Sequence, residues 1–296
     1  MKQKRKLTPY LYSAPAFLLI ALVIVFPILY TAYISLTNMN LFHWADYEII
    51  GLENYVRALT KVDSGFLSAL LVTMLWTVLN MVIQVVAAYF IALGLNREGL
   101  KGRRIYKTLL MFPWAMPAYV SILLWRVGIY NTEFGLLNKI LVEIGLSKVN
   151  FLSTNVPAFL SCMVLNLWMA LPFMIMTIDG ALQSIDKSSY ESAQMEGAGF
   201  WAKHFHITVP ALRVVIMPAV IMTTFTTFKQ FDIIYLLTGG GPANATTTVP
   251  IYAYNMGWGT KLLGRSSAVT MLILAFLMLV CVVYFTIIGK WEKEDK

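Results

Sequence analysis

The sequence predicts an all-α, polytopic membrane protein with six transmembrane helices. Of its 296 residues, 58% are hydrophobic and only 13% are charged, whereas about a quarter of the residues in ordinary soluble domains are charged. The apolar residues are gathered in stretches with few or no charges, each long enough for the roughly 20 residues that a membrane-spanning helix needs. Such stretches must be helical in lipid, because a helix satisfies its own backbone hydrogen bonds.

Six stretches are expected to cross the membrane, and loops connect them. Their approximate bounds are 14–36, 66–95, 105–127, 157–178, 210–237 and 268–288. In the second stretch, Asn80 and Gln84 lie one helical turn apart. We expect these two side chains to hydrogen-bond another helix, since amides are rarely left facing lipid.

Lysine and arginine residues indicate which loops lie on the cytoplasmic side. They cluster before the first stretch, after the second, after the fourth and at the end of the chain: Lys2, Lys4, Arg5, Lys6; Arg97, Lys101, Arg103, Arg104, Lys107; Lys187, Lys203, Arg213; Lys290, Lys293, Lys296. By the positive-inside rule, both termini are cytoplasmic, and the loop after the first stretch and the segment 239–265 are external. The net charge of +8 therefore indicates topology rather than nucleic-acid binding.

The sequence contains no motif typical of an enzyme. It has no Walker A phosphate loop, HExxH, GxSxG or CxxC, so we expect no catalysis, no cofactor and no nucleotide hydrolysis by this chain. His204 and His206 are two residues apart and point to different faces of a helix, with no third ligand nearby, so we expect no metal site. Transport or channel function is then the default for six spans.

The loop at 186–210 differs from the others because it is long, cytoplasmic and patterned as two short helices around glycine. Ser188 and Glu191 have the spacing of a capping box, which predicts a helix that begins here and stops at Gly197. A second helix is expected from near Phe200. Physical arguments alone leave two roles open: docking of a partner protein, or an ordinary helical hairpin at the membrane interface.

This loop resembles the EAA motif, E-A-A-x3-G-x9-I-x-L-P, of permease subunits of binding-protein-dependent ABC importers. The matching residues are Glu191, Ala193, Gly197, Ile207 and Pro210. Ser192 and Val209 depart from the motif, and both substitutions are conservative in volume. Three other segments resemble motifs of the maltose and glycerol-3-phosphate type, in particular of the first permease of the pair: G-L-x-N-Y at 51–55, P-x-x-x-P at 113–117 and L-T-x-G-G-P at 237–242.

The resemblance implies a type I ABC importer permease fold and an inner-membrane protein of a bacterium or archaeon. Residues 1–65 would form the N-terminus, first helix and external loop, residues 66–290 the permease core with its coupling loop at 186–210, and residues 291–296 a cytoplasmic tail. The implied partners are a second permease, two cytoplasmic ABC ATPase subunits and an extracytoplasmic solute-binding protein that delivers an oligosaccharide, disaccharide or polyol. A stand-alone secondary transporter or channel of six helices is the alternative. No internal repeat or mid-span charge favours it.

By the same resemblance, residues 188–206 would sit in a cleft of the ATPase, with Glu191 bonded to a basic group there. A simple capping role for Glu191 remains open as well. The sugar path is expected on polar and aromatic residues of the fourth and fifth spans: Asn166, Ala170, Thr226, Thr227, Phe228, Gln230 and Phe231. Thr227 and Gln230 are three apart, which would place them on one helical face. Packing against a neighbouring helix is the alternative for each of these residues.

Overall fold

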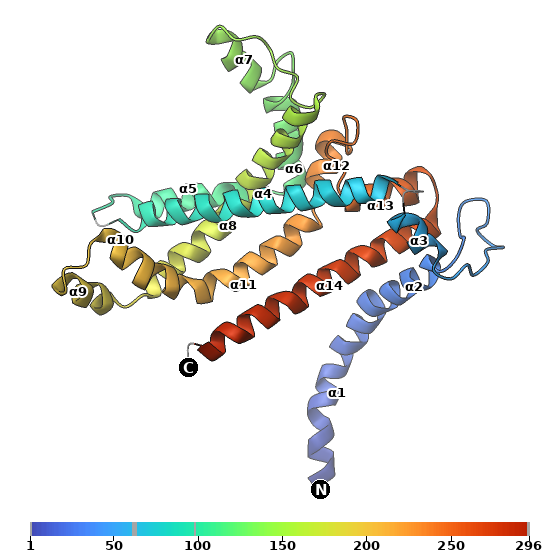
Figure 1. Cartoon of the computed structure of the whole chain (residues 1–296), viewed down its shortest axis with the longest axis horizontal. Helices are drawn as coiled ribbons and strands as arrows, with labels where there is room; N and C mark the ends of the chain where they lie inside the picture. The colour runs from blue at the N-terminus through green and yellow to red at the C-terminus, as the bar shows by residue number, and fades with distance from the viewer. Residues whose placement is uncertain (1, 61–63, 98, 295–296) are drawn as a thin grey trace. The chain divides into compact units, whose positions relative to one another are not determined.

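The structure, a computed structural model, describes residues 2–60, 64–97 and 99–294 (Figure 1). Its regular structure is helical, and within these ranges the only β feature is an isolated antiparallel bridge between Thr37 and Ile49. The all-α prediction is therefore confirmed. The chain forms two compact units, Met1–Ser68 with Tyr252–Lys296 and Ala69–Ile251, which are described separately below.

The first unit contains the two ends of the chain. Its elements are α1 (Lys2–Ile20), the π-helical turn η1 (Ala21–Val25), α2 (Phe26–Ser35), α3 (Glu53–Leu59), the π-helical turn η5 (Asn255–Gly259) and α14 (Leu263–Glu294). α14 packs against α2 and α3. The buried Asn54 amide donates to the carbonyls of Ser35 and Thr37, at 2.9 and 2.8 Å, and so ties α3 to the end of α2. A Cβ at Gly264 would lie 2.2 Å from the Thr37 carbonyl oxygen, so α14 needs glycine in its first turn.

The second unit contains the middle of the chain. It comprises most of α4 (Ser64–Leu95), then α5 (Arg103–Ala115), α6 (Ala118–Leu124), η3 (Trp125–Ile129), α7 (Leu136–Glu143), α8 (Asn155–Ser184), α9 (Lys187–Met195), α10 (Phe200–Lys203), η4 (His204–Thr208), α11 (Val209–Phe228), α12 (Asp232–Thr238) and the start of α13 (Val249–Tyr254). The 30 residues of α8 span about 45 Å. Figure 1 shows α7 at one end of α8 and α9 and α10 at the other.

Two apolar clusters hold the second unit together along α4 and α8. One includes Trp76, Leu165 and Ile234, which join α4, α8 and α12. The other includes Ala88 and Ala92, both fully buried, together with residues of α8 and α11. Small side chains at such positions let membrane helices approach closely, so van der Waals contact replaces the hydrophobic driving force that lipid does not supply.

Four described helices are long and apolar enough to cross a membrane as single rods. They are Tyr10–Ser35, Gly65–Leu95, Asn155–Ser184 and Leu263–Thr286, which correspond to the predicted spans 1, 2, 4 and 6. The predicted spans 3 and 5 are each a pair of helices bent by 92° and 58°, and six crossings result if each pair spans once. Two of the six predicted spans are therefore bent pairs of helices rather than single straight helices.

Proline accounts for the bends in these two spans. Pro117 forces the preceding Met116 into an extended conformation, with ψ of 141°, and α5 ends there. In α11, Pro218 removes a backbone donor and crowds the carbonyl four residues earlier, at the place where the 58° bend occurs. Span 5 is also interrupted at residues 229–231, between α11 and α12.

Candidate functional site

The loop at 186–210 begins with a helix cap that differs from the predicted one. Asp186 is the N-cap of α9, and its carboxylate accepts a hydrogen bond from the Ser188 backbone N–H at 3.0 Å. The predicted capping box of Ser188 and Glu191 is therefore wrong: α9 begins one residue before Ser188, and a carboxylate fills the cap. Hydrogen bonds from Ser188 also hold the pKa of the exposed Asp186 carboxyl below its ordinary value.

Gly197 ends α9 and reverses the chain, as predicted. It has a φ of +80°, and its N–H bonds to the Gln194 carbonyl while the Ala198 N–H bonds to the Ala193 carbonyl, at 3.0 and 2.9 Å. This pair of bonds is a Schellman motif, which satisfies carbonyls left free at a helix end. Any other residue would be strained at this φ. α10 then begins at Phe200, where the sequence predicts a second helix.

The loop exposes a carboxylate and an apolar surface. Glu191 is exposed, and no described residue makes a hydrogen bond or ion pair with its side chain. The apolar residues are Met195, 90% exposed, and Phe200, Trp201 and Phe205, each at least 60% exposed. The rings of Trp201 and Phe205 stack with centroids 6.0 Å apart. Of the other EAA positions, Ala193 and Ile207 are half-buried, and Pro210 is exposed at the start of α11. Exposed apolar clusters of this kind are typical of a protein interface.

Two hydrogen bonds hold the loop in place, one within the loop and one to the helical bundle. The Tyr190 hydroxyl lies 2.9 Å from the Thr208 hydroxyl, which joins α9 to η4. The Tyr89 hydroxyl of α4 lies 2.7 Å from Nε2 of the buried His204. His206, by contrast, is exposed and bonds the Ala202 carbonyl of its own helix. The loop therefore contacts α4 directly, and it continues into α11 through η4.

A buried charge cluster lies at the same end of the bundle. Asp179 of α8, 2% exposed, binds the Lys107 ammonium and lies 3.2 Å from the Arg103 guanidinium of α5. Asn96, just beyond α4, donates to the same carboxylate at 2.7 Å. Breaking a buried cluster of this kind is costly, because it leaves charges without partners. The cluster therefore fixes the ends of α4, α5 and α8 seven residues before the Asp186 cap.

The second candidate region is the interruption between α11 and α12. The Thr227 carbonyl bonds the Gln230 N–H at 3.2 Å, and it also accepts a hydrogen bond from the Trp76 indole N–H at 3.0 Å. An interrupted membrane helix needs such a partner for its freed backbone groups. Since α11 ends at Phe228, the prediction that Thr227 and Gln230 share one helical face is wrong.

The polar pair in α4 links this region to α8. The Asn166 amide of α8 donates to the Asn80 side-chain oxygen at 2.8 Å, and Gln84 donates to the Ala170 carbonyl at 3.1 Å. The prediction that Asn80 and Gln84 bond another helix is thus confirmed. Asn80 also donates to the Trp76 carbonyl, so a chain of hydrogen bonds runs from α8 through α4 to α11.

The predicted path residues differ in burial. Thr227, Phe228 and Asn166 are buried, whereas Thr226 is exposed and Ala170, Gln230 and Phe231 are half-buried. Thr226 bonds only carbonyls of its own helix. No described residue hydrogen-bonds the Gln230 side-chain amide. The sequence interpretation missed Trp76, Tyr89 and Asp179. A lone indole in an aliphatic span is the signal that could have identified Trp76.

Comparisons with known proteins give the same architecture. Residues 84–291 match the family model of the binding-protein-dependent transport system inner membrane component. The chain is 31% identical over 294 residues to the trehalose/maltose transport system permease protein MalF of Thermococcus litoralis, covering 99% of this chain and 97% of that protein.

Solved transporter structures share this fold. A crystal structure of a bacterial ABC transporter involved in the import of the acidic polysaccharide alginate matches with a TM-score of 0.82 at 20% identity, over 96% of both chains. The same kind of transporter in complex with an alginate pentasaccharide-bound periplasmic protein matches with a TM-score of 0.81 at 21% identity, over 95% of this chain and 93% of that one. The chain has the type I ABC importer permease fold. It belongs to the family of binding-protein-dependent transport system inner membrane components, and it is a multi-pass transport subunit rather than an enzyme.

Proposed function

We propose that the chain is one permease subunit of an ATP-driven carbohydrate importer. It forms the translocation path with a second permease, while two cytoplasmic ATPase subunits hydrolyse ATP and an extracytoplasmic solute-binding protein delivers an oligosaccharide, disaccharide or polyol. The similarity to a trehalose/maltose permease over nearly the whole of both chains supports a carbohydrate substrate.

The loop at 186–210 couples the permease to its ATPase. The observation that carries this proposal is that Glu191, Met195, Trp201 and Phe205 are all exposed on the short helices of the loop. A carboxylate without a described partner is suited to a charge-assisted bond with a basic group of the ATPase. Gly197 sets the angle between the helices, and Ala193, Ile207 and Pro210 complete the segment. Movement of the loop passes to α11 through the backbone and to α4 through Tyr89 and His204.

The sugar path runs beside the interruption between α11 and α12. Interrupted helices are common at transporter binding sites, where backbone groups face a polar cavity. The half-buried Gln230 amide and Phe231 ring supply the hydrogen bonding and stacking that sugars need. The remaining residues frame this region from α8 and the last turn of α11: Asn166, Ala170, Thr226, Thr227 and Phe228.

Both termini are cytoplasmic in this proposal. The basic loop at 97–107 and the loop at 186–210 lie at the same end of the second unit, since Asp179 binds Arg103 and Lys107.

Cysteine labelling tests this topology. In a cysteine-free background, cysteines that replace the exposed Phe42 and Ala243 should react with an impermeant maleimide added outside, and one that replaces Lys101 should not. Labelling of Lys101→Cys from outside would contradict this topology and place the loop at 97–107 on the external side.

Co-purification and uptake test the assignment as a whole. A tagged chain should bring down a second permease and an ATPase, and the reconstituted complex should hydrolyse ATP faster when the sugar-loaded binding protein is added. Uptake of sugar by vesicles containing this chain alone would instead favour a secondary transporter or a channel.

A further inference from the structure

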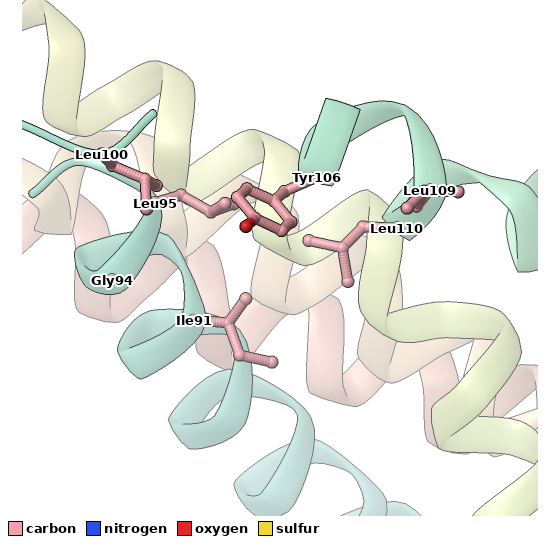
Figure 2. Close-up of a pocket in the computed structure, with 7 residues that line it drawn as sticks. All are labelled: Ile91, Gly94, Leu95, Leu100, Tyr106, Leu109 and Leu110. Atoms are coloured by element: carbon pink, nitrogen blue, oxygen red, sulfur yellow. The ribbon is translucent and has the colours of Figure 1, made fainter. Parts of the chain in front are cut away.

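An apolar groove lies between the end of α4 and the start of α5 (Figure 2). Its volume is about 480 Å³, and its walls include Ile91, Gly94 and Leu95 from α4 and Tyr106, Leu109 and Leu110 from α5. Figure 2 shows the Tyr106 ring reaching across towards Leu95. A Cβ atom added at Gly94 would have no neighbouring atom within 4 Å, so the groove is open beside that residue. All of these residues belong to the second unit.

Cationic side chains gather at one end of this groove. The segment between α4 and the second turn of α5 carries five of them: Arg97, Lys101, Arg103, Arg104 and Lys107. Asp179 binds two, Arg103 and Lys107. Arg97, Lys101 and Arg104 are exposed, and no described carboxylate pairs with them. The one acidic residue in the segment, Glu98, lies outside the described residues. Five cations against two carboxylates leave an excess of positive charge.

The spacing of charge and groove matches the two parts of a phospholipid. Along α5, Leu110 lies seven residues beyond Arg103, which is about 10 Å further along the helix axis. A phosphate at the level of Lys101 and Arg104 would therefore have its acyl chain at the level of the groove. Basic pockets beside apolar surface on the cytoplasmic side are typical of anionic-lipid sites.

We propose that this groove binds an anionic phospholipid of the cytoplasmic leaflet, with an acyl chain between α4 and α5 and the phosphate on Lys101 and Arg104. The proposal uses the cytoplasmic placement of the loop at 97–107 given under Proposed function. The charge distribution favours lipid over an apolar helix of the partner permease, since a helix would fill the groove and leave both cations without anionic partners. A lipid here would contact the same ends of α4 and α5 that Asp179 holds to α8.

Photo-crosslinking in the assembled transporter tests this site. The complex is placed in phosphatidylcholine nanodiscs with a small fraction of phosphatidylglycerol that carries a diazirine on its acyl chain, and a phosphatidylcholine probe with the same chain is the control. Mass spectrometry should locate the phosphatidylglycerol adducts within residues 91–110. Each lysine or arginine near a membrane surface contributes about fivefold to anionic-lipid affinity. Lys101→Gln with Arg104→Gln should therefore weaken binding about 30-fold and remove most of the adduct.

Matched variants separate the groove from its charged end. Gly94→Leu fills the groove and should remove the adduct, whereas Gly94→Ala should keep it. Changing an exposed lysine of α7 at the opposite end of the unit, Lys139→Gln, should also keep the adduct.

Two labelling results would overturn the proposal: equal labelling by both probes, and phosphatidylglycerol labelling that survives the Lys101 and Arg104 changes. So would capture of the partner permease, rather than lipid, by a photoreactive residue at position 109. If Gly94→Leu prevents assembly, the combined Lys101→Gln and Arg104→Gln variant still tests the proposal. Labelling does not require transport, so a chain that failed to import sugar could still show the site.

Discussion

The Tyr89 hydroxyl and the His204 imidazole, 115 residues apart in the chain, lie 2.7 Å from each other and join α4 to the loop at 186–210. His204 is buried, and its ring also packs edge to face against Tyr89, with centroids 5.4 Å apart. The loop that we propose to dock on the ATPase is therefore joined to α4 by a side-chain contact as well as to α11 by the backbone.

Tyr89→Phe should reduce coupling while the complex still assembles. The change keeps the ring but removes the hydroxyl, which leaves a buried imidazole nitrogen unpaired at a cost of about 1 to 3 kcal/mol. We expect binding-protein-stimulated ATP hydrolysis and uptake to fall severalfold, measured in proteoliposomes. Tyr119→Phe, which removes an exposed hydroxyl from α6, is the control and should behave as wild type. Equal behaviour of the two variants would mean that the Tyr89 contact carries no coupling.

Glu191→Ala should weaken the contact with the ATPase, because it removes one side of a charged hydrogen bond. Such bonds contribute about 1.5 to 3 kcal/mol, or roughly 10- to 150-fold in affinity. Gly197→Pro should misplace the second helix, since proline cannot adopt a φ of +80° or donate the Schellman bond. Membrane insertion should be unchanged in both variants, and stimulated ATP hydrolysis should be lost. The control is Glu143→Ala, an exposed carboxylate of α7. Wild-type stimulation in both variants would exclude this loop as the coupling element.

Asp179→Leu should destabilise the complex strongly, by about 3 to 5 kcal/mol, because Lys107 and Arg103 lose their buried counterion. Adding Lys107→Leu should recover part of the loss by removing one of the two stranded cations. Thermal inactivation of the purified complex measures both effects. Glu133→Leu breaks an exposed ion pair with Lys148 and should cost less than about 1 kcal/mol. Similar losses from the buried and the exposed pair would contradict the burial seen at Asp179.

Thr227→Val combined with Gln230→Leu should slow uptake or change the preference among sugars. The volumes stay similar, while the half-buried Gln230 amide loses a hydrogen bond to a substrate hydroxyl, worth about 0.5 to 1.5 kcal/mol, and the buried Thr227 loses its hydroxyl beside the interruption. Stimulated ATP hydrolysis should be largely kept, which separates this phenotype from that of the loop variants. Thr270→Val, which removes a hydroxyl bonded within α14, is the control. Unchanged uptake of every tested sugar in the double variant would place the path elsewhere.

Local patterns in the sequence predicted the parts of this structure that depend on neighbouring residues. Asn80 and Gln84 share a hydrogen-bonding face because they are one helical turn apart. The chain reverses at Gly197 because glycine has the backbone freedom that the turn needs. The cap at Asp186 and the break at Met116 are also local, but several residues compete for each role, and hydropathy alone does not choose between them. The pairs Trp76 with Thr227 and Tyr89 with His204 could not be predicted, because 151 and 115 residues separate them and only the folded bundle brings them together.

Contact between the loop at 186–210 and the ATPase is the central claim, and site-specific photo-crosslinking measures it most directly. A photoreactive phenylalanine analogue replaces Met195, 90% exposed at the end of α9, or Phe134, exposed near α7 at the opposite end of the bundle. Irradiation of the assembled transporter should join the ATPase to the chain through position 195 and not through position 134. Absence of an ATPase adduct at 195, or an equal adduct at 134, would contradict the assignment of this loop as the coupling element.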